Sequence, residues 1–269
     1  MNRSGPGRAV AVAVALCLAG CSAGDPAGQG RPPVPEGVGF DYQIGGASTP
    51  DSDVGLVVRD RAAEPAPGVY SVCYVNGYQA QESEIGFWRA DHADLLLTDD
   101  DGGPVVDTDW NEQLLDISTG SKRAAVAAVV GGWIAGCAKD GFDAVEIDNL
   151  DSPTRSHGLL TSDDALAYAG ELIERAHGAG LAIGQKNAVA AAGRGARAGF
   201  DFAVAEECAR YDECGDYAGA YPGRVYDVEY RKGDFDRACA HPVPGVSVVL
   251  RDLGVTPPGD DAHVRAVCP

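Results

Sequence analysis

Three segments of the chain repeat one pattern: a helical run that ends at a glycine, a short apolar strand, and then polar residues. The apolar strands lie at 144–149, 181–187 and 202–206, and they follow Gly141, Gly180 and Gly199. Glycine often ends a helix, and short apolar runs with this flanking are typical of buried strands. Strands that alternate with helices pair in parallel through right-handed crossovers. The repeat therefore predicts an α/β fold with a parallel sheet.

The whole chain supplies nine segments with strand character. Helical patterns separate several of them, most clearly over 121–139 and from Thr161 onward, where acidic residues fill the first turn. We predict a single (β/α)8 TIM-type barrel with one extra strand, which we place among the first two segments. The main alternative is an open doubly wound sheet, but no glycine-rich phosphate loop follows the first strand. The nine segments are 40–44, 54–58, 69–76, 114–117, 144–149, 181–187, 202–206, 225–230 and 246–250.

The amino-terminal region has the pattern of an export signal. Arg3 and Arg8 precede an apolar run over 9–18, and small residues then lead to Cys21. The run is short for a membrane span, so residues 1–20 are interpreted as a signal peptide. The pattern resembles that of bacterial lipoproteins, in which this cysteine is acylated, and ordinary signal cleavage is the alternative. Both readings predict export from the cytoplasm, and the first anchors Cys21 to the cell membrane.

Residues 21–38 are rich in Gly, Pro and Ala and are interpreted as a flexible, lipid-anchored tether. The remaining residues, 39–269, are long enough to bury a large core and form one domain of barrel size. The formal net charge of the chain is −19, which excludes nucleic acid as a partner. Such acidity suits either a soluble exported surface or the attraction of a cationic polymer.

Six cysteines remain after Cys17 and Cys21 are set aside, and six in an exported protein predict three disulfides. The sequence alone allows 15 pairings. We favour one pair within a polar loop, one between a strand's outer face and a covering helix, and one from the two that remain. No pair has the CxxC spacing of a zinc site, the histidines are scattered, and no cofactor motif occurs. The favoured pairs are Cys208–Cys214, Cys73–Cys137 and Cys239–Cys268.

Polar residues stand at nearly every strand's carboxyl end, while the strand bodies are apolar. Carboxyl ends of parallel strands meet at one rim of a barrel, where acids, amides and aromatic rings form an active site or a binding cleft. The alternative is that these are ordinary solvated loop residues. The residues at the ends are Gln43, Asn76 with Tyr78, Asp116, Asp148 with Asn149, Lys186 with Asn187, Glu206 with Glu207, Glu229 with Tyr230, and Arg251 with Asp252.

Two carboxylates across a cleft are the minimum equipment for glycoside hydrolysis. Asp148 and Glu206 are the best candidates, because each ends an apolar strand and burial there shifts pKa values. Glu146 shares the parity of Asp148, so it points into the barrel either as a partner of the pair or as a buried acid satisfied by Lys186. Glu207 has the opposite parity to Glu206 and should face outward or cap the next helix.

The order of short motifs after the tether resembles glycoside hydrolase family 114, the endo-α-1,4-polygalactosaminidase-like barrels. The resemblance implies a (β/α)8 barrel with a rim cleft and retaining hydrolysis of α-1,4-linked galactosamine polymers. It also implies that Asp148 is the nucleophile and Glu206 the general acid/base. The motifs are 41–44, 72–74, Trp110 before 115–117, 141–151, 184–187, 206–208 with Tyr211 and 213–214, 228–230, and 251–253.

With this resemblance, nine further residues become candidates for substrate binding, and the expected partner is an extracellular amino-sugar polysaccharide. Asp116 and Glu229 are rim acids that could hold amines or hydroxyls. Two other functions stay open: a non-catalytic carbohydrate-binding lipoprotein on the same barrel, and a hydrolase for a different glycan. The candidates are Gln43, Tyr74, Trp110, Asp116, Asn149, Lys186, Asn187, Glu229 and Tyr230.

Overall fold

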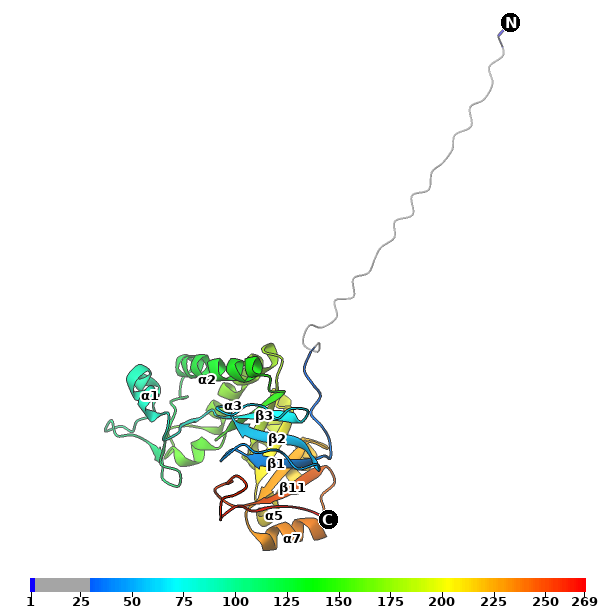
Figure 1. Cartoon of the computed structure of the whole chain (residues 1–269). Coiled ribbons are helices and arrows are strands. Elements are labelled where there is room, and N and C mark those ends of the chain that lie inside the picture. The colour runs from blue at the N-terminus through cyan, green and yellow to red at the C-terminus, as the bar shows by residue number, and fades with distance from the viewer. Residues whose placement is uncertain (3–29) are drawn as a thin grey trace.

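A computed structural model describes residues 1–2 and 30–269, and its centre is a nearly closed barrel of eight parallel strands (Figure 1). Each strand pairs in parallel with the next along the sheet, and the first and last parallel strands lie side by side. The strands are, in spatial order, β1 (Gly39–Gln43), β2 (Val54–Asp60), β3 (Tyr70–Asn76), β7 (Ala144–Asp148), β8 (Ala182–Lys186), β9 (Phe202–Glu206), β10 (Val225–Glu229) and β11 (Val246–Arg251).

Helices cover the outside of the barrel, with α2 and α3 on one side in Figure 1 and α5 and α7 on the opposite side. Loops rather than helices join β1 to β2 and β2 to β3. The α-helices are α1 (Ile85–Asp91), α2 (Gly120–Asp140), α3 (Ser162–Gly178), α4 (Ala192–Ala198), α5 (Cys208–Tyr211), α6 (Cys214–Ala220) and α7 (Lys232–Ala240), and the short 3-10 helices are η2 (Ala93–Leu95), η3 (Ser152–Arg155) and η4 (Val189–Ala191).

Both helices that the sequence predicts most clearly are confirmed, and their ends have local causes. Helix α3 begins with a capping box, in which the Thr161 side chain accepts from the Asp164 amide and the Asp164 side chain accepts from the Thr161 amide. This exchange satisfies two amides that have no partner inside the helix. Helix α2 ends at Gly141, which has φ of 94°, a left-handed conformation that glycine adopts without a steric penalty.

The expected position of the extra strand is wrong. Both early segments belong to the barrel, and the ninth strand of its sheet is β12 (Arg265–Val267), which pairs antiparallel with β11. The segment 114–117 is not a barrel strand: the structure has β6 (Glu112–Leu114) there, in a separate antiparallel sheet with β4 (Gln79–Ala80) and β5 (Val106–Asp107). Its apolar residues pack on the outer core beside α2, so the local pattern looks like that of a barrel strand.

The barrel interior is filled by large side chains on alternate strand positions. Phe40, Phe202 and Tyr226 pack edge to face within it, and all three are buried. Gly184 also faces inward, and a Cβ atom built there would lie 2.4 Å from the Phe202 ring. The missing side chain at Gly184 therefore leaves space for the Phe202 ring of β9. Gly184 lies two residues before Lys186 on the same side of β8, so the ring packs below Lys186 inside the barrel.

Residues 31–38, which the sequence assigns to the tether, pack against the amino-terminal end of the barrel. Val34 and Val38 contact the interior cluster, and the carbonyl oxygen of Pro35 accepts a hydrogen bond from the Tyr226 hydroxyl. The first strand, β1, begins at Gly39, and the apolar residues among the preceding Gly and Pro cover the open end of the barrel. The predicted Cys21 anchor and most of the predicted signal peptide lie outside the described residues.

All three favoured disulfides are present. Cys73 faces outward from β3 and bonds to Cys137 of α2, and the other two bonds join Cys208 to Cys214 and Cys239 to Cys268. Within the described part of the chain, no helix has both the length and the apolar character that a membrane crossing requires.

Candidate active site

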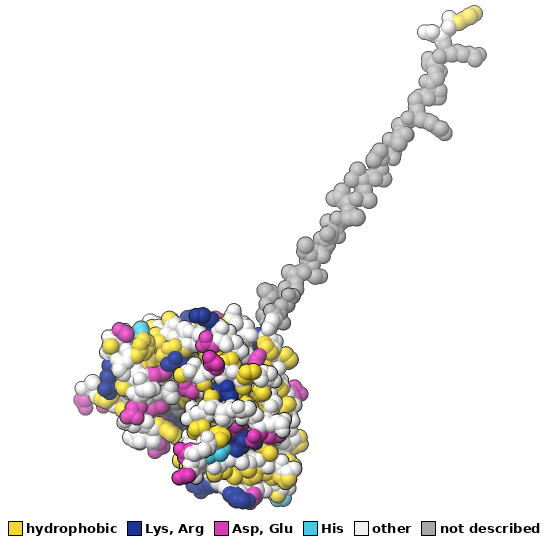
Figure 2. All heavy atoms as spheres, in the orientation of Figure 1, with side chains coloured by type: hydrophobic (Ala, Val, Ile, Leu, Met, Phe, Trp, Pro, Cys, Tyr) yellow, Lys and Arg dark blue, Asp and Glu magenta, His cyan; other side chains and the backbone are white. Residues whose placement is uncertain are grey.

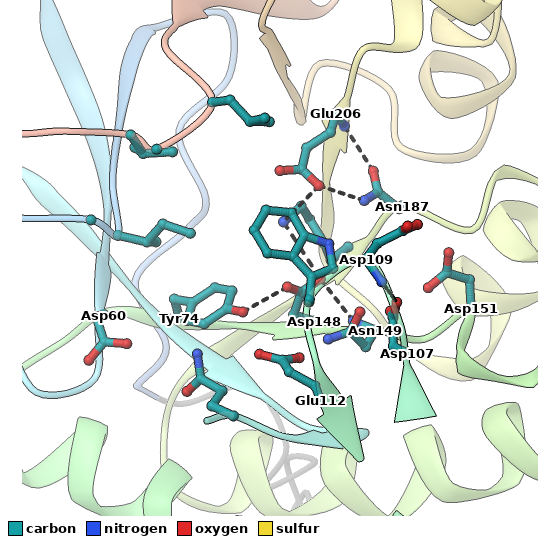
Figure 3. Close-up of a pocket in the computed structure, with 18 of the residues that line it drawn as sticks. Asp60, Tyr74, Asp107, Asp109, Glu112, Asp148, Asn149, Asp151, Asn187 and Glu206 are labelled. Carbon is teal, nitrogen blue, oxygen red and sulfur yellow. Dashed lines mark hydrogen bonds and ion pairs between the residues drawn. The ribbon is translucent and has the colours of Figure 1, made fainter. Parts of the chain in front are cut away.

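A cavity of about 330 Å³ opens at the carboxyl ends of the barrel strands. Asp148 and Glu206 point into it from β7 and β9, with Tyr74 and Asn187 beside them (Figure 3). Its wall is the carboxyl rim of the barrel on one side and the small β4–β6–β5 sheet with its loop on the other. The lining residues are Ile44, Gly45, Asp60, Tyr74, Gln81, Asp107, Asp109, Trp110, Glu112, Asp148, Asn149, Asp151, Arg155, Lys186, Asn187, Glu206, Tyr230, Leu253, Gly254 and Val255.

Asp148 ends β7, and both of its carboxylate oxygens are held. The Tyr74 hydroxyl donates to Oδ2 over 2.8 Å, and the backbone N–H of Asn149 donates to Oδ1 over 2.8 Å. Hydrogen bonds to a carboxylate stabilise its charged form and fix its orientation. The carboxylate is thus aimed at the cavity in one direction, which is what attack on a bound sugar requires.

Glu206 ends β9 and is held by three donors. Asn187 Nδ2 donates to Oε2 over 2.8 Å, the Tyr230 hydroxyl donates to Oε1, and Lys186 Nζ lies 3.3 Å from Oε2. Burial alone would raise the pKa of Glu206, but the Lys186 ammonium and the two hydrogen bonds outweigh it and hold the pKa below the ordinary glutamate value. Glu206 is therefore ionised at neutral pH.

Lys186 is the only buried ammonium in the described part of the site, and it joins the two carboxylates. Its side chain is 1% exposed, and Nζ lies 3.6 Å from Asp148 Oδ1 and 3.3 Å from Glu206 Oε2. Because Asp148 Oδ1 and Glu206 Oε2 lie at these distances from the same nitrogen, the two oxygens are at most about 7 Å apart. Burial lowers the pKa of Lys186, but the surrounding acids raise it well above the ordinary lysine value, so the nitrogen stays charged.

Glu146 lies beneath this pair inside the barrel and is fully buried. Tyr42 donates to its Oε1 over 3.0 Å, and Lys186 Nζ lies 3.2 Å from the same oxygen and also donates to the Tyr42 hydroxyl. The two interpretations of Glu146 are compatible with each other. Lys186 satisfies the buried Glu146 carboxyl group, and Glu146 in turn supports Lys186, which contacts both Asp148 and Glu206. Burial raises the pKa of Glu146 to about 7, although the Lys186 charge opposes this rise.

A sharp turn follows each of the three central side chains. Asn149, Asn187 and Glu207 come directly after Asp148, Lys186 and Glu206, and their φ angles are 69°, 48° and 58°. Asparagine tolerates this left-handed region better than most residues, while a glutamate in it costs about 1–2 kcal/mol. Strained backbone of this kind concentrates at functional sites. Here it ends each strand at once and leaves the preceding side chain at the rim.

The wall opposite the barrel rim is strongly acidic. Asp107, Asp109 and Glu112 come from the small sheet and its loop, and Figure 2 shows Asp and Glu side chains gathered beside the hollow on the left of the molecule. Arg155 is the one cation on this side among the described lining residues. Its guanidinium is held by Asp107 at 2.8 Å and Asp151 at 2.7 Å, so its charge is already compensated. The cavity as a whole carries a surplus of negative charge.

One group of ligand-type atoms within residues 1–2 and 30–269 is close enough to share a metal ion, and it lies outside this cavity. It consists of Cys208, Cys214 and Asp227. The two cysteines are bonded to each other, so their sulfurs are not thiolate ligands. The polar groups that line the cavity are carboxylates, amides, hydroxyls, the Arg155 guanidinium and the Lys186 ammonium.

Comparison with known families agrees with this geometry. The model of glycoside hydrolase family GH114 matches residues 22–269, which is nearly the whole chain. The chain belongs to glycoside hydrolase family 114. The barrel fold is thus shared with a family of glycoside hydrolases.

Two solved structures resemble the GH114 domain in fold. The crystal structure of Aspergillus fumigatus Ega3 in complex with galactosamine superposes with a TM-score of 0.69 at 21% identity, covering 89% of this chain and 98% of Ega3. The glycoside hydrolase domain of PelA from Pseudomonas aeruginosa gives a TM-score of 0.53 at 17% identity, covering 84% of this chain and 97% of that domain. No curated protein sequence matches the chain.

The structure of this GH114 protein brings together most of the residues that the sequence predicts for the site. Trp110 is 61% exposed and offers an apolar face at the entrance of the cavity. Glu207 faces away from it and pairs with Arg210 at 2.6 Å, as its parity predicts. The predicted site residues that line the cavity are Tyr74, Trp110, Asp148, Asn149, Lys186, Asn187, Glu206 and Tyr230.

The other three predicted site residues do not line the cavity, and each has a structural partner instead. Gln43 is buried, and its Oε1 accepts from Arg59 Nε over 3.0 Å. Asp116 accepts from Ser118 at the start of α2. Glu229 is fully buried on the outer face of β10, where it accepts from the first amides of α5. The parity of β10 decides the last case, because Val228 and Tyr230 face inward.

The acids of the small sheet were missed by sequence reasoning. Asp107, Asp109 and Glu112 flank Trp110 within six residues, and acids clustered around an exposed aromatic residue were the one available signal. The sequence analysis places a barrel strand at 114–117 and assigns a role to Trp110 alone among the residues just before it, so it does not place these acids at the rim. The antiparallel pairing of Gln79 with Leu114 brings this segment over the cavity.

Proposed function

We propose that this GH114 protein is an endo-acting glycoside hydrolase that cleaves α-1,4-linked galactosamine polymers with retention of configuration, using Asp148 and Glu206. The observation that carries the proposal is that both carboxylates line one cavity and contact the same Lys186 ammonium. A site that only bound sugar would have no need of such a pair. The endo mode and the linkage are proposed from the similarity to the family.

The spacing of the pair is compatible with retention. Retaining enzymes hold their carboxyl groups about 5–5.5 Å apart, and inverting enzymes hold them about 6.5–9.5 Å apart. The contacts with Lys186 place Asp148 Oδ1 and Glu206 Oε2 at most about 7 Å apart, a bound that includes the retaining distance and the lower end of the inverting range. Retention is therefore proposed from the similarity to the family.

In the first step, the protonated form of Glu206, which is a minor form at neutral pH, gives its proton to the leaving oxygen. A carboxylate oxygen of Asp148 attacks the anomeric carbon as the bond to that leaving oxygen breaks. In the second step, Glu206 takes a proton from water, and the water oxygen displaces Asp148 from the sugar. The ester of Asp148 carries no charge, so Glu206 loses a negative neighbour and its pKa falls further. Its carboxylate form is the one that the second step needs as a base.

The charge of the cavity supports a cationic sugar as substrate. Its acidic wall attracts the ammonium groups of a de-N-acetylated polymer and raises their local concentration. Ega3, which shares the fold, was solved with galactosamine. The exposed ring of Trp110 suits stacking against the apolar face of a sugar. We further propose that the protein is exported and anchored to the cell membrane through a lipid on Cys21, where it meets extracellular polysaccharide.

The test is release of reducing ends from partially deacetylated α-1,4-polygalactosamine by the wild type, Asp148→Asn and Glu206→Gln. We expect each variant to lose about 10²–10⁴-fold in rate, the range that acid/base or nucleophilic side chains supply. Glu207→Gln is the matched control, because this neighbour faces away from the cavity and should retain activity. Binding without release by the wild type would make the protein a carbohydrate-binding lipoprotein, and release only from other polymers in a panel would reassign the glycan.

A further inference from the structure

Glu112 is a third carboxyl group in the cavity, and the proposed two-carboxylate mechanism does not use it. It begins β6 of the small sheet, and its Oε2 accepts a hydrogen bond from Asn76 Nδ2 over 2.8 Å. Its Oε1 accepts no hydrogen bond from the described residues. The side chain is therefore held by one oxygen and presents the other to the cavity that it lines.

The position of Glu112 relative to Asp148 follows from the sheet. Asn76, which holds Glu112, is the register partner of Asp148 across β3 and β7, and its Oδ1 accepts from Asn149 Nδ2 over 3.1 Å. Neighbouring strands are about 4.8 Å apart, so Glu112 lies next to the space in which Asp148 meets a sugar. In Figure 3 its carboxyl group points toward Asp148 and Tyr74.

We propose that Glu112 contacts the substituent on carbon 2 of the sugar whose anomeric carbon meets Asp148, and that it selects a free amine over an acetamide there. The inference rests on the proposed function and assigns its specificity to one residue. Carbon 2 is bonded to the anomeric carbon, so its substituent is the ring group nearest to a side chain beside Asp148. An ammonium offers only donors and a positive charge, which a carboxylate matches with charge-assisted hydrogen bonds.

An acetamide in the same place meets Glu112 differently in its two protonation states. A carboxylate can accept from the acetamide N–H, but it repels the acetamide oxygen and gains no charge pairing, whereas a neutral carboxyl group can donate a hydrogen bond to that oxygen. Burial raises the pKa of Glu112 to about 7, nearby negative charges add to the rise, and the Asn76 hydrogen bond opposes it. Discrimination against the acetamide should therefore increase as the pH rises through neutrality.

Several ionisable groups face Glu112 and set the range over which this change occurs. Asp148 comes from the barrel and Asp107 from the small sheet, and Glu84 precedes α1. Their charges are partly compensated by Lys186 at Asp148, by Arg155 at Asp107 and by Arg61 at Glu84. The facing hydroxyl is that of Tyr74, whose pKa is raised well above 10, first by burial, so it stays neutral in this range.

The experiment measures kcat/KM for matched α-1,4-galactosamine and N-acetylgalactosamine oligomers between pH 5.5 and 7.5. An α-amino group of a peptide loses its proton at about pH 7.7–8, and a sugar amine with a similar pKa remains mostly cationic across the range. For the wild type, we expect the ratio of amine to acetamide activity to rise about tenfold with pH. For Glu112→Gln, we expect a ratio at pH 7.5 about tenfold lower than that of the wild type, and no pH dependence of the ratio.

Glu82→Gln is the matched control. Glu82 is exposed and lies outside the lining of the cavity, and its substitution removes the same charge as Glu112→Gln. Glu112→Asp keeps the carboxylate and should keep the direction of the pH effect even if Glu112→Gln folds poorly. Equal loss on both oligomers in Glu112→Gln, or a pH-dependent ratio that survives in it, would overturn the inference while leaving the proposed function intact. A wild type that cleaves neither oligomer would overturn the proposed function, and the inference with it.

Discussion

Replacing Lys186 by Met removes the ammonium and keeps most of the side-chain volume. The nitrogen lies within 3.6 Å of oxygens from Glu146, Asp148 and Glu206, so the variant leaves three acids facing one another without a cation. Removing one partner of a buried ion pair costs about 3–5 kcal/mol. For a domain of this size, each kcal/mol lowers Tm by about 2–4 °C, so the expected loss is about 6–20 °C at pH 7.5.

The sign of the pH dependence tests the cause of this loss. In the wild type, the pKa of Glu206 lies below its unfolded value, so Glu206 contributes stability above about pH 4.3 that is lost as the pH falls through the folded pKa. Without Lys186, the pKa of Glu206 rises, and protonation of the acids at low pH relieves their repulsion. The difference in Tm between wild type and Lys186→Met should therefore shrink between pH 7.5 and pH 4.5.

Thermal unfolding of both proteins at the two pH values is the assay. The matched control is Lys232→Met, because Lys232 forms an exposed pair with Asp236 on the surface and should change Tm by less than about 4 °C, as surface pairs contribute about 0–1 kcal/mol. An equal Tm loss for Lys186→Met at pH 7.5 and pH 4.5 would refute the electrostatic account and point to packing. A loss no larger than that of the control would show that the carboxylates are not coupled through this residue.

Three further outcomes follow from the structure. If Glu206 supplies the first proton, kcat/KM should fall as the pH rises above the lowered pKa of Glu206, which gives an acidic optimum. A pH–rate profile that stays flat to neutrality would instead assign the role of nucleophile to Glu206. Trp110→Ala removes the exposed ring at the entrance, so KM for the polymer should rise about tenfold with little change in kcat, and an unchanged KM would place the sugar elsewhere. Replacing Cys73 and Cys137 together by Ala opens a loop of 64 residues and should lower the unfolding free energy by about 2–4 kcal/mol in chemical denaturation. An unfolding free energy equal to that of the wild type would contradict the role of the bond.

The barrel strands could be predicted because their bodies are largely apolar and they end at polar residues. Burial on both faces leaves few other interpretations for such a segment when a helix and a glycine precede it. The same reasoning failed at 114–117, where an apolar segment packs on the outer core without joining the barrel. Apolar composition indicates burial, but it does not say against which layer a segment is buried.

The site shows the same division. The positions of Asp148 and Glu206 were predictable, because the carboxyl end of an apolar parallel strand lies at the carboxyl rim of the barrel. Gln43 and Glu229 stand at strand ends as well, but a buried arginine and the first turn of α5 hold them away from the cavity. Glu112 could not be predicted, since its place depends on a small antiparallel sheet whose strands are two or three residues long.

The sequence by itself indicated the parallel barrel, the position of Asp148 and Glu206 at its rim, and a favoured set of three disulfides, because each follows from local periodicity, chain order or cysteine position. Only the tertiary structure decided that one buried ammonium joins Asp148 to Glu206, and that an acidic wall from outside the barrel faces them. Contacts of this kind depend on distances between segments far apart in the chain. Periodicity fixes the face on which a residue lies, and packing alone fixes its neighbours there.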